Sequence, residues 1–393
     1  MKKLTAIFMS AVMCFLFAGC SNETAQSSDG QASTDSVSSA EVEIPKPDGF
    51  KVDGTKLIDG YGEEFVMRGV NHAYTWFKSD TDTALEGIEY VGSNTVRLVL
   101  SDGDQWDKVS RAELKSLIRK CKKKNLIAVL EIHDGAGKDE VSYLEHAVDY
   151  WIEMKDLLGE NKAYTIVNIA NEWYGTYNDL ETWRDAYINA VKKLRDAGIE
   201  NTLIVDSAGW GQCADSVLKY GNEILKADKD ANTMFAVHMY GTAGKNEETV
   251  KNTIDTAIKN NLCLLIGEFG WKHTDGNVAY DTIMQYSTEK NIGYLAWSWK
   301  GNGDDVSYLD VSRDWSGVDL TTEWGKPLVE GEYGIKKTSK NQMGMLDNVY
   351  NKKYKKLVDQ NIRWKPTYTE KSVEGKDLAC LLQICKEENL QVM

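Results

Sequence analysis

Strand-like and helix-like segments alternate along most of this chain, and this alternation limits the fold to a few α/β architectures. The strand-like segments are apolar runs that end near His72, Leu100, Asp134, Glu172, Gly209, Tyr240, Gly270 and Gly301. One strand–helix unit takes roughly thirty residues, the size of a βα repeat. Eight units in roughly 290 residues fit a (β/α)8 TIM barrel better than a doubly wound sheet. No Gly-x-Gly-x-x-Gly sequence follows a strand-like segment, so a dinucleotide-binding fold has no support.

Local patterns place helices between these strands. Ser110 and Glu113 form a capping-box pattern that opens a helix running to Lys124. Apolar residues recur at helical spacing in four further segments, residues 141–152, 180–197, 246–260 and 278–290. Before the first strand, Asp-Gly turns between short apolar segments predict a β-hairpin that covers the bottom of the barrel. The predicted fold class is therefore α/β, a TIM barrel with a short N-terminal β-hairpin.

The two ends of the chain differ in composition from the barrel segment. Lys2 and Lys3 precede an apolar run that ends in Phe17-Ala-Gly-Cys20, which resembles a bacterial lipobox. We therefore expect an exported protein, held at the cell surface by lipid on Cys20 or released outside the cell. Ordinary signal cleavage that leaves Cys20 unmodified is the alternative. The expected organisation is a lipoprotein signal peptide over 1–20, a disordered tether over 21–45, a (β/α)8 domain over 46–338 and an extension of unknown role over 339–393.

Charge and cysteine content bear on partners and cofactors. The net charge of −14 disfavours nucleic acid, which binds basic surfaces. Beyond Cys14 and Cys20, the remaining cysteines are odd in number and fit no zinc or haem spacing, so we expect buried thiols. Asp102, Asp104 and Asp107 share one loop and could bind calcium, but a single loop of carboxylates is usually solvated. We expect no cofactor, no catalytic metal, a monomer, and membrane contact only through lipid on Cys20.

Two glutamates at the ends of apolar strands carry the strongest chemical indication. Glu172 follows the apolar run of residues 166–170, and Glu268 follows that of residues 262–267. Because the C-terminal ends of barrel strands meet at one rim, the two carboxyl groups are expected to face each other. Paired carboxylates in such a place favour glycoside hydrolysis. The alternative is that each glutamate is a solvated loop residue that begins a helix.

Further polar and aromatic residues occur at the predicted strand ends. The ordered set is Arg97, His133, Asn171-Glu172, His238-x-Tyr240, Glu268-Phe-Gly and Trp297. This set resembles glycoside hydrolase family 5, a (β/α)8 group of retaining β-glycosidases, and the resemblance covers about residues 60–338. Within that family, phrases such as Arg68-Gly-Val-Asn-His72 and Leu295-Ala-Trp-Ser-Trp299 are most similar to those of bacterial endo-β-1,4-mannanases.

The resemblance implies distinct roles for the two glutamates. Glu172 would be the general acid/base, which must be protonated to deliver a proton to the leaving oxygen. Glu268 would be the nucleophile, which must be ionised, and Arg97 and Tyr240 would hold it so by charge and hydrogen bonding. A retaining enzyme keeps these carboxyl groups roughly 5–5.5 Å apart, too close for an attacking water between them.

The same resemblance implies a set of substrate-binding residues. Asn171 would bind the sugar 2-hydroxyl, and His133 and His238 would bind hydroxyls or orient the glutamates. Trp297 would form the platform beneath the cleaved sugar. The remaining candidates are His72, Trp76, Trp173, Trp210, Trp299 and Trp315. For each tryptophan taken singly, core packing is about as frequent as sugar stacking.

The predicted function is endo-acting hydrolysis of β-1,4-mannosidic bonds in mannan, glucomannan or galactomannan, through a covalent glycosyl-enzyme. Two alternatives stay open. A β-1,4-glucanase of the same family would use the same catalytic set, because mannose and glucose differ only at the 2-hydroxyl. A non-catalytic, carbohydrate-binding surface lipoprotein is the alternative from another class, although such a protein has no need of both glutamates.

Overall fold

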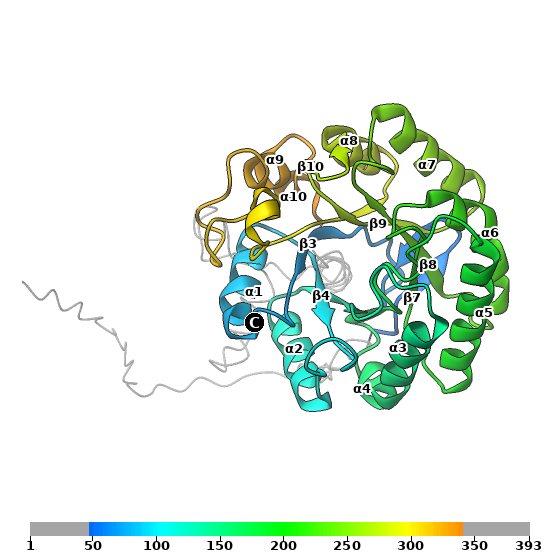
Figure 1. Ribbon diagram of the computed structural model, residues 1–393. Helices are drawn as coiled ribbons and strands as arrows, with labels where there is room; N and C mark the ends of the chain where they lie inside the picture. The colour runs from blue at the N-terminus through cyan, green and yellow to red at the C-terminus, as the bar shows by residue number, and fades with distance from the viewer. Residues whose placement is uncertain (1–46, 341–393) are drawn as a thin grey trace, which may run out of the picture. The chain divides into compact units, whose positions relative to one another are not determined.

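A closed barrel of eight parallel strands forms the centre of the computed structural model, which describes residues 47–340. The eight strands are β3 (Arg68–His72), β4 (Thr95–Leu100), β5 (Ile127–Ile132), β6 (Thr165–Asn168), β7 (Leu203–Asp206), β8 (Thr233–Met239), β9 (Leu264–Phe269) and β12 (Gly293–Ala296). Each strand pairs with its neighbour in chain order, and β12 pairs with both β9 and β3 to close the barrel (Figure 1). The prediction of a TIM barrel is confirmed.

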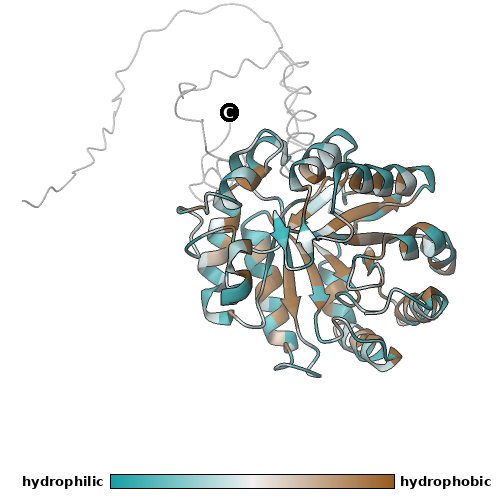
Figure 2. Cartoon of the chain, turned by 45° about the horizontal axis from the view of Figure 1, so that its top comes forward, coloured by the Kyte–Doolittle hydropathy of each residue, from teal (hydrophilic) through white to brown (hydrophobic). Residues whose placement is uncertain are grey.

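Helices cover the outside of the barrel and bury its apolar strands (Figure 2). The principal helices are α1 (Thr81–Tyr90), α2 (Arg111–Lys123), α3 (Val141–Glu153), α4 (Lys155–Glu160), α5 (Leu180–Asp196), α6 (Ala214–Ala227), α7 (Glu247–Lys259) and α8 (Tyr280–Glu289). The predicted capping box is present, since Ser110 accepts from the Glu113 N–H and Glu113 accepts from the Ser110 N–H. The five helices predicted from periodicity and capping are thereby confirmed to within two residues at each end.

Short elements complete the described chain. They are the 3-10 turns η1 (Lys78–Asp80) and η2 (Asp304–Leu309), the small hairpin β10 (Lys272–His273) with β11 (Gly276–Asn277), and helices α9 (Gly325–Glu330) and α10 (Ile335–Thr338). Among residues 47–340, no helix has the length and apolar character needed to cross a membrane. The predicted signal peptide and tether, and nearly all of the C-terminal extension, lie outside the described residues.

The N-terminal hairpin closes one end of the barrel, as predicted. Strands β1 (Lys51–Asp53) and β2 (Lys56–Ile58) pair across a turn in which Gly54 has φ +60°. Phe50 and Leu57 from this hairpin join a buried cluster with residues near the starts of the barrel strands, namely Ile127, Ile166, Met234 and Leu265. Apolar burial of this kind stabilises the fold by about 25 cal/mol per Å². The hairpin therefore seals the N-terminal end of the barrel and leaves the opposite rim for chemistry.

The prediction of buried thiols is confirmed for Cys121 and Cys263 but not for Cys213, which is only partly buried. Cys121, Cys213 and Cys263 are free thiols, and Cys121 and Cys263 are buried. Burial raises the pKa of both Cys121 and Cys263 to about 12, so neither ionises at neutral pH. Cys380 and Cys385 lie outside the described residues.

Candidate active site

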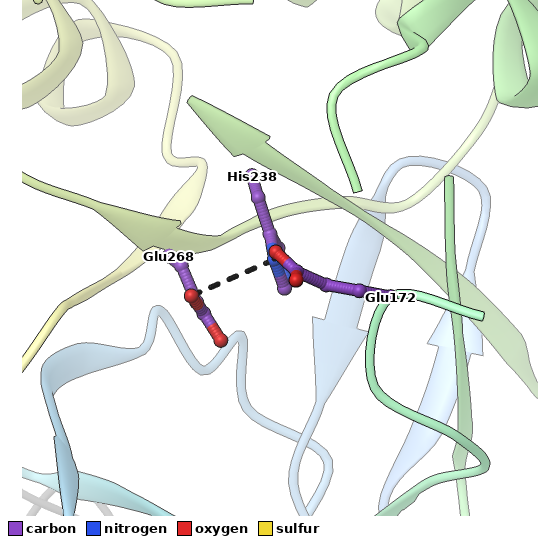
Figure 3. Close-up of side chains that lie close together, drawn as sticks. All are labelled: Glu172, His238 and Glu268. Atoms are coloured by element: carbon purple, nitrogen blue, oxygen red, sulfur yellow. Dashed lines mark hydrogen bonds and ion pairs between the residues drawn. The ribbon is translucent and has the colours of Figure 1, made fainter. Parts of the chain in front are cut away.

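Glu172 and Glu268 face each other at the C-terminal rim of the barrel. Glu268 is part of β9, whereas Glu172 lies four residues beyond the end of β6. A carboxylate oxygen of each glutamate and a ring nitrogen of His238 all lie within 4.8 Å of one another (Figure 3). Retaining glycosidases hold their carboxyl groups about 5–5.5 Å apart, and inverting ones about 6.5–9.5 Å apart. The close spacing therefore suits direct attack by one carboxylate and not activation of a water lying between the two.

Two donors hold the carboxylate of Glu268. Arg97 Nη1 donates to Oε1 at 2.9 Å and the Tyr240 hydroxyl donates to Oε2 at 2.8 Å. The side chain is only 5% exposed, and this burial raises the pKa of Glu268, while the charges of His238 and Arg97 act in the opposite direction. Both oxygens thus have fixed orientations, as a nucleophile requires.

Arg97 connects Glu268 to the interior of the barrel. Its guanidinium is fully buried and donates to the side-chain oxygens of Asn71, Asn168 and Asn171 at 2.7–2.9 Å. It also forms ion pairs with Asp206 at 3.5 Å and Glu131 at 3.7 Å. Burial alone would lower the pKa of Arg97, but the surrounding carboxylates raise it, so the guanidinium stays charged.

Glu172 has a different environment from Glu268. Its side chain is 14% exposed, and its backbone is left-handed, with φ +48°. His238 Nδ1 lies 2.7 Å from Glu172 Oε1. Burial disfavours charge on His238, but Glu268, Asp206 and Glu172 outweigh it and raise the pKa of His238 to about 9. An imidazolium at His238 therefore donates its Nδ1–H to Oε1 of Glu172.

Aromatic rings line the rim next to the two carboxylates. The ring of His133 stacks on Trp297 with centroids 6.0 Å apart and planes 26° from parallel. Trp76 makes edge contacts with both His133 and Trp106, at 5.3 and 5.2 Å. Flat apolar rings with polar edges suit sugars, which present CH groups on one face and hydroxyls at the rim.

Comparisons with known proteins agree with this geometry. A protein-family model described as "Cellulase (glycosyl hydrolase family 5)" matches residues 58–303. The chain belongs to glycosyl hydrolase family 5. A second model, described as "DltD protein", matches residues 329–393, of which the structure describes only 329–340.

Individual relatives in family 5 extend over most of the chain. The mannan endo-1,4-beta-mannosidase of Salipaludibacillus agaradhaerens is 50% identical over 292 residues, which cover 74% of this chain and 94% of that protein. The corresponding enzyme of Streptomyces lividans is 40% identical and covers 74% of this chain and 76% of its own length. The mannohexaose complex of Thermomonospora fusca beta-mannanase superposes with a TM-score of 0.71 at 36% identity, over 76% of this chain and 99% of that chain.

The structure brings most of the predicted family 5 residues together. Arg97, Tyr240 and His238 contact one or both of the glutamates, and Asn171 contacts Arg97. His133 and Trp297 lie beside them in the aromatic surface. Trp76 and Trp210 are exposed by 39% and 49%, so both have ring surface available to a ligand.

Three predicted binding residues lie elsewhere. His72 is fully buried and bonds to the Thr81 hydroxyl, and burial lowers its pKa to about 3. The indole N–H of Trp173 donates to the Glu140 carbonyl, and that of Trp299 donates to the Trp315 carbonyl. Because none of the three has exposed surface, the structure places them in packing and not at the rim.

Two buried carboxylates of the site were missed by sequence reasoning. Asp206 is the last residue of β7 and Glu131 lies inside β5, and both are fully buried. Each interrupts or ends an otherwise apolar strand. Buried carboxylates are rare without a charged or hydrogen-bonding partner. An acidic residue within a predicted core strand could therefore have indicated a buried polar site.

Glu172, His238 and Glu268 form the one group of three His, Cys, Asp or Glu side chains within residues 47–340 whose spacing could hold a metal ion. Protein donors already bind these groups, since His238 bonds to Glu172 and Arg97 and Tyr240 bond to Glu268. In the loop considered for calcium, Asp102 accepts from the Asp104 N–H. Burial, followed by the negative charge of Asp134, raises the pKa of Asp102 to about 7.

Proposed function

We propose that this protein is an endo-β-1,4-mannanase that cleaves β-mannan chains with retention of configuration. The observation that carries the chemistry is the pair of carboxyl groups, Glu172 and Glu268, whose nearest oxygens lie within 4.8 Å at the rim of a family 5 barrel. The proposed substrate class rests on the two relatives named above, which are mannan endo-1,4-beta-mannosidases and are 50% and 40% identical to this chain. No cofactor enters this chemistry.

The first step is attack by the Glu268 carboxylate on the anomeric carbon of the cleaved mannose. Glu172 gives a proton to the leaving oxygen at the same time, so that no alkoxide is released. A mannosyl ester with Glu268 results. In the second step Glu172, now ionised, takes a proton from water, and the water oxygen attacks the anomeric carbon and releases Glu268.

Asn171 is arranged to bind the substrate during these steps. Its Oδ1 accepts from Arg97 at 2.7 Å, which fixes the orientation of the amide. Its Nδ2 is buried and has no hydrogen-bond partner within the described part of the chain. A buried donor without a partner is costly, about 1–3 kcal/mol. A sugar hydroxyl that accepts from Nδ2 removes this cost, and the 2-hydroxyl of the cleaved mannose is the hydroxyl we assign to it.

A substrate panel tests the specificity. Reducing-sugar release is measured on linear mannan, glucomannan, galactomannan and carboxymethylcellulose. We expect the mannose-containing polymers to be hydrolysed and carboxymethylcellulose to be poorly used. Faster hydrolysis of carboxymethylcellulose than of mannan would assign the protein to the family's β-1,4-glucanases, which use the same catalytic pair.

A nucleophile variant tests the mechanism. Glu268→Ala should lose nearly all turnover yet still bind mannan, since the aromatic surface is intact, and this combination separates an enzyme from a binding protein. Azide should partly restore turnover of an activated aryl mannoside, with a glycosyl azide of inverted configuration as product. Labelling of another carboxylate by a mechanism-based mannoside would overturn the assignment.

We also propose that the protein is exported and anchored by lipid on Cys20, with residues 21–45 as a spacer. The support is the basic and apolar N-terminal sequence that ends in Phe17-Ala-Gly-Cys20. Cys20→Ser should move mannanase activity from the membrane fraction to the medium. An unchanged partition would contradict the lipid anchor.

A further inference from the structure

A buried carboxylate, that of Asp206, lies next to Glu172, the residue proposed as the acid/base. Asp206 ends β7 and is fully buried. Its Oδ1 accepts from Asn168 Nδ2 at 2.9 Å. Its Oδ2 accepts from the Glu172 N–H at 3.0 Å and lies 3.5 Å from both Arg97 Nη2 and His238 Nε2. Asp206 thus joins β4, β6, β8 and the Glu172 loop.

The bond to the Glu172 peptide holds a strained residue. A left-handed backbone costs a non-glycine residue about 1–2 kcal/mol, and Glu172 has φ +48°. Its N–H is bound by Asp206, and its carbonyl accepts from the Gly137 N–H at 3.2 Å. Hydrogen bonds to an ionised acceptor are about twice as strong as neutral ones. Asp206 therefore supplies the stronger of the two bonds that fix the direction of the Glu172 side chain.

The second contact of Asp206 is an ion pair with His238 Nε2 at 3.5 Å, and this nitrogen has no hydrogen bond within residues 47–340. A Cβ on Gly211 would come within 2.6 Å of the ring, and one on Gly267 within 3.0 Å, so the imidazole fits between two glycines. Three carboxylates face the ring: Asp206 at Nε2, and Glu172 and Glu268 at Nδ1, at 2.7 and 3.7 Å. The cation Arg97 lies beyond Asp206 and Glu268 and not against the ring.

We infer that Asp206 is a positioning residue for the acid/base, which it controls through the Glu172 peptide N–H and through the ring of His238. With the negative charge of Asp206 at Nε2, the imidazolium form persists, and its Nδ1–H holds Glu172 Oε1. The high pKa of His238, about 9, agrees with this arrangement. The catalytic part of this inference rests on the proposed function, whereas the effect of Asp206 on the protonation of His238 does not depend on any substrate.

Glu131 offers a matched comparison for Asp206. It is also fully buried and also forms an ion pair with Arg97, at 3.7 Å. Glu131 Oε1 bonds to His133 Nδ1 at 3.0 Å, and within residues 47–340 Glu131 forms no hydrogen bond or ion pair with Glu172 or His238. Glu131→Gln and Asp206→Asn therefore remove the same charge from the surroundings of Arg97, and only Asp206→Asn removes it from the acid/base.

The first measurement is the titration of His238 in the full-length protein by NMR of its ring nitrogens. The chain has only 5 histidines, and His238→Gln identifies the signal. Loss of an opposite charge at this distance changes a pKa by about 1–3 units. Asp206→Asn should lower the pKa of His238 by an amount in this range, and Glu131→Gln should lower it by much less.

The second measurement separates positioning from a general loss of structure. Misplacement of a catalytic group by about 1 Å costs on the order of 10²-fold. For Asp206→Asn we therefore expect kcat/KM to fall by about 10²-fold on mannohexaose, which needs the proton of Glu172. With an activated aryl mannoside, which needs no proton in its first step, kcat/KM should fall far less. If wild type were inactive on mannohexaose, the proposed function would fail, while the His238 titration would still test Asp206.

A further variant covers the case in which Asp206→Asn does not fold. Asp206→Glu keeps the charge beside Arg97 and His238 but displaces the oxygen from the Glu172 N–H. It should show the same unequal loss on the two substrates, with little change in the titration of His238. Equal losses on both substrates, or an equal change of the His238 pKa in Asp206→Asn and Glu131→Gln, would show that Asp206 is only a counter-ion of Arg97 and would overturn the inference.

Discussion

Replacing Arg97 by methionine tests how the barrel interior balances its charges. Methionine fills a similar volume, but it leaves Glu268, Asp206 and Glu131 without the cation that they share. Removing one partner from a buried ion pair costs about 3–5 kcal/mol. We therefore expect the free energy of unfolding at pH 7 to fall by about 3–5 kcal/mol, a large part of the about 5–15 kcal/mol typical of a domain.

The same substitution should change the pH dependence of both stability and activity. Burial raises the pKa of Glu268 and Arg97 opposes this, so the pKa rises further in Arg97→Met and the acidic limb of kcat/KM moves to higher pH. When Glu268 is protonated it carries no charge, so the loss of Arg97 no longer leaves a buried charge without a partner. The stability deficit of the variant should therefore shrink as the pH falls through the folded-state pKa of Glu268.

Denaturant unfolding followed by tryptophan fluorescence measures the first effect, and pH profiles of kcat/KM measure the second. Arg97→Lys keeps one charge but loses the planar fork, so it should restore part of the stability and part of the acidic limb. Arg184→Met removes a surface arginine paired with Asp185 and should change little. Equal losses of stability in Arg97→Met and Arg184→Met, or a deficit that does not vary with pH, would refute the reasoning.

Three further predictions concern single contacts. Gly211→Ala should lower kcat/KM, because its Cβ would lie 2.6 Å from the His238 ring, whereas Gly62→Ala, also at positive φ but in open space, should keep full activity. Glu131→Gln should lower the pKa of His133, because burial already disfavours the charged ring and the charge of Glu131 contributes most to raising this pKa. NMR of the ring nitrogens measures the pKa. Arg195→Met should lower the free energy of unfolding by about 3–5 kcal/mol, because Asp228 loses its buried partner. The difference in unfolding free energy between variant and wild type should become smaller as the pH falls through the lowered pKa of Asp228. Denaturant unfolding at several pH values measures both effects.

Local sequence patterns were sufficient to predict the barrel because each of them acts within one segment. The Ser110 capping box is satisfied by two bonds within three residues, so its outcome does not depend on the remainder of the fold. The apolar strands needed burial on both faces, and eight βα units supply it in a closed barrel. The end of β6 differed from the prediction, since the strand stops at Asn168 and the left-handed Glu172 cannot continue it.

The tryptophans show what a local pattern cannot decide. Trp173 directly follows Glu172 in the sequence, yet it packs against Tyr187 of α5 and is fully buried. Trp210 lies in a run of three residues with positive φ, together with Gly209 and Gly211, and its ring lies over Gly137 with half its surface exposed. Both tryptophans follow strands, so only the backbone path of each loop determines which ring reaches the rim.

The two glutamates differ in how many of their carboxylate oxygens are bound by other residues, and this difference fits the roles proposed for them. Both oxygens of Glu268 are bound, by Arg97 and Tyr240, and the side chain is 5% exposed. A nucleophile attacks a single atom, the anomeric carbon, so a fixed orientation of its carboxylate is compatible with catalysis. Glu172 is held through one oxygen by His238 and through its peptide N–H by Asp206, and it is 14% exposed. An acid/base must reach a leaving oxygen in one step and a water in the next, so one free oxygen on an anchored residue is the arrangement that serves both steps.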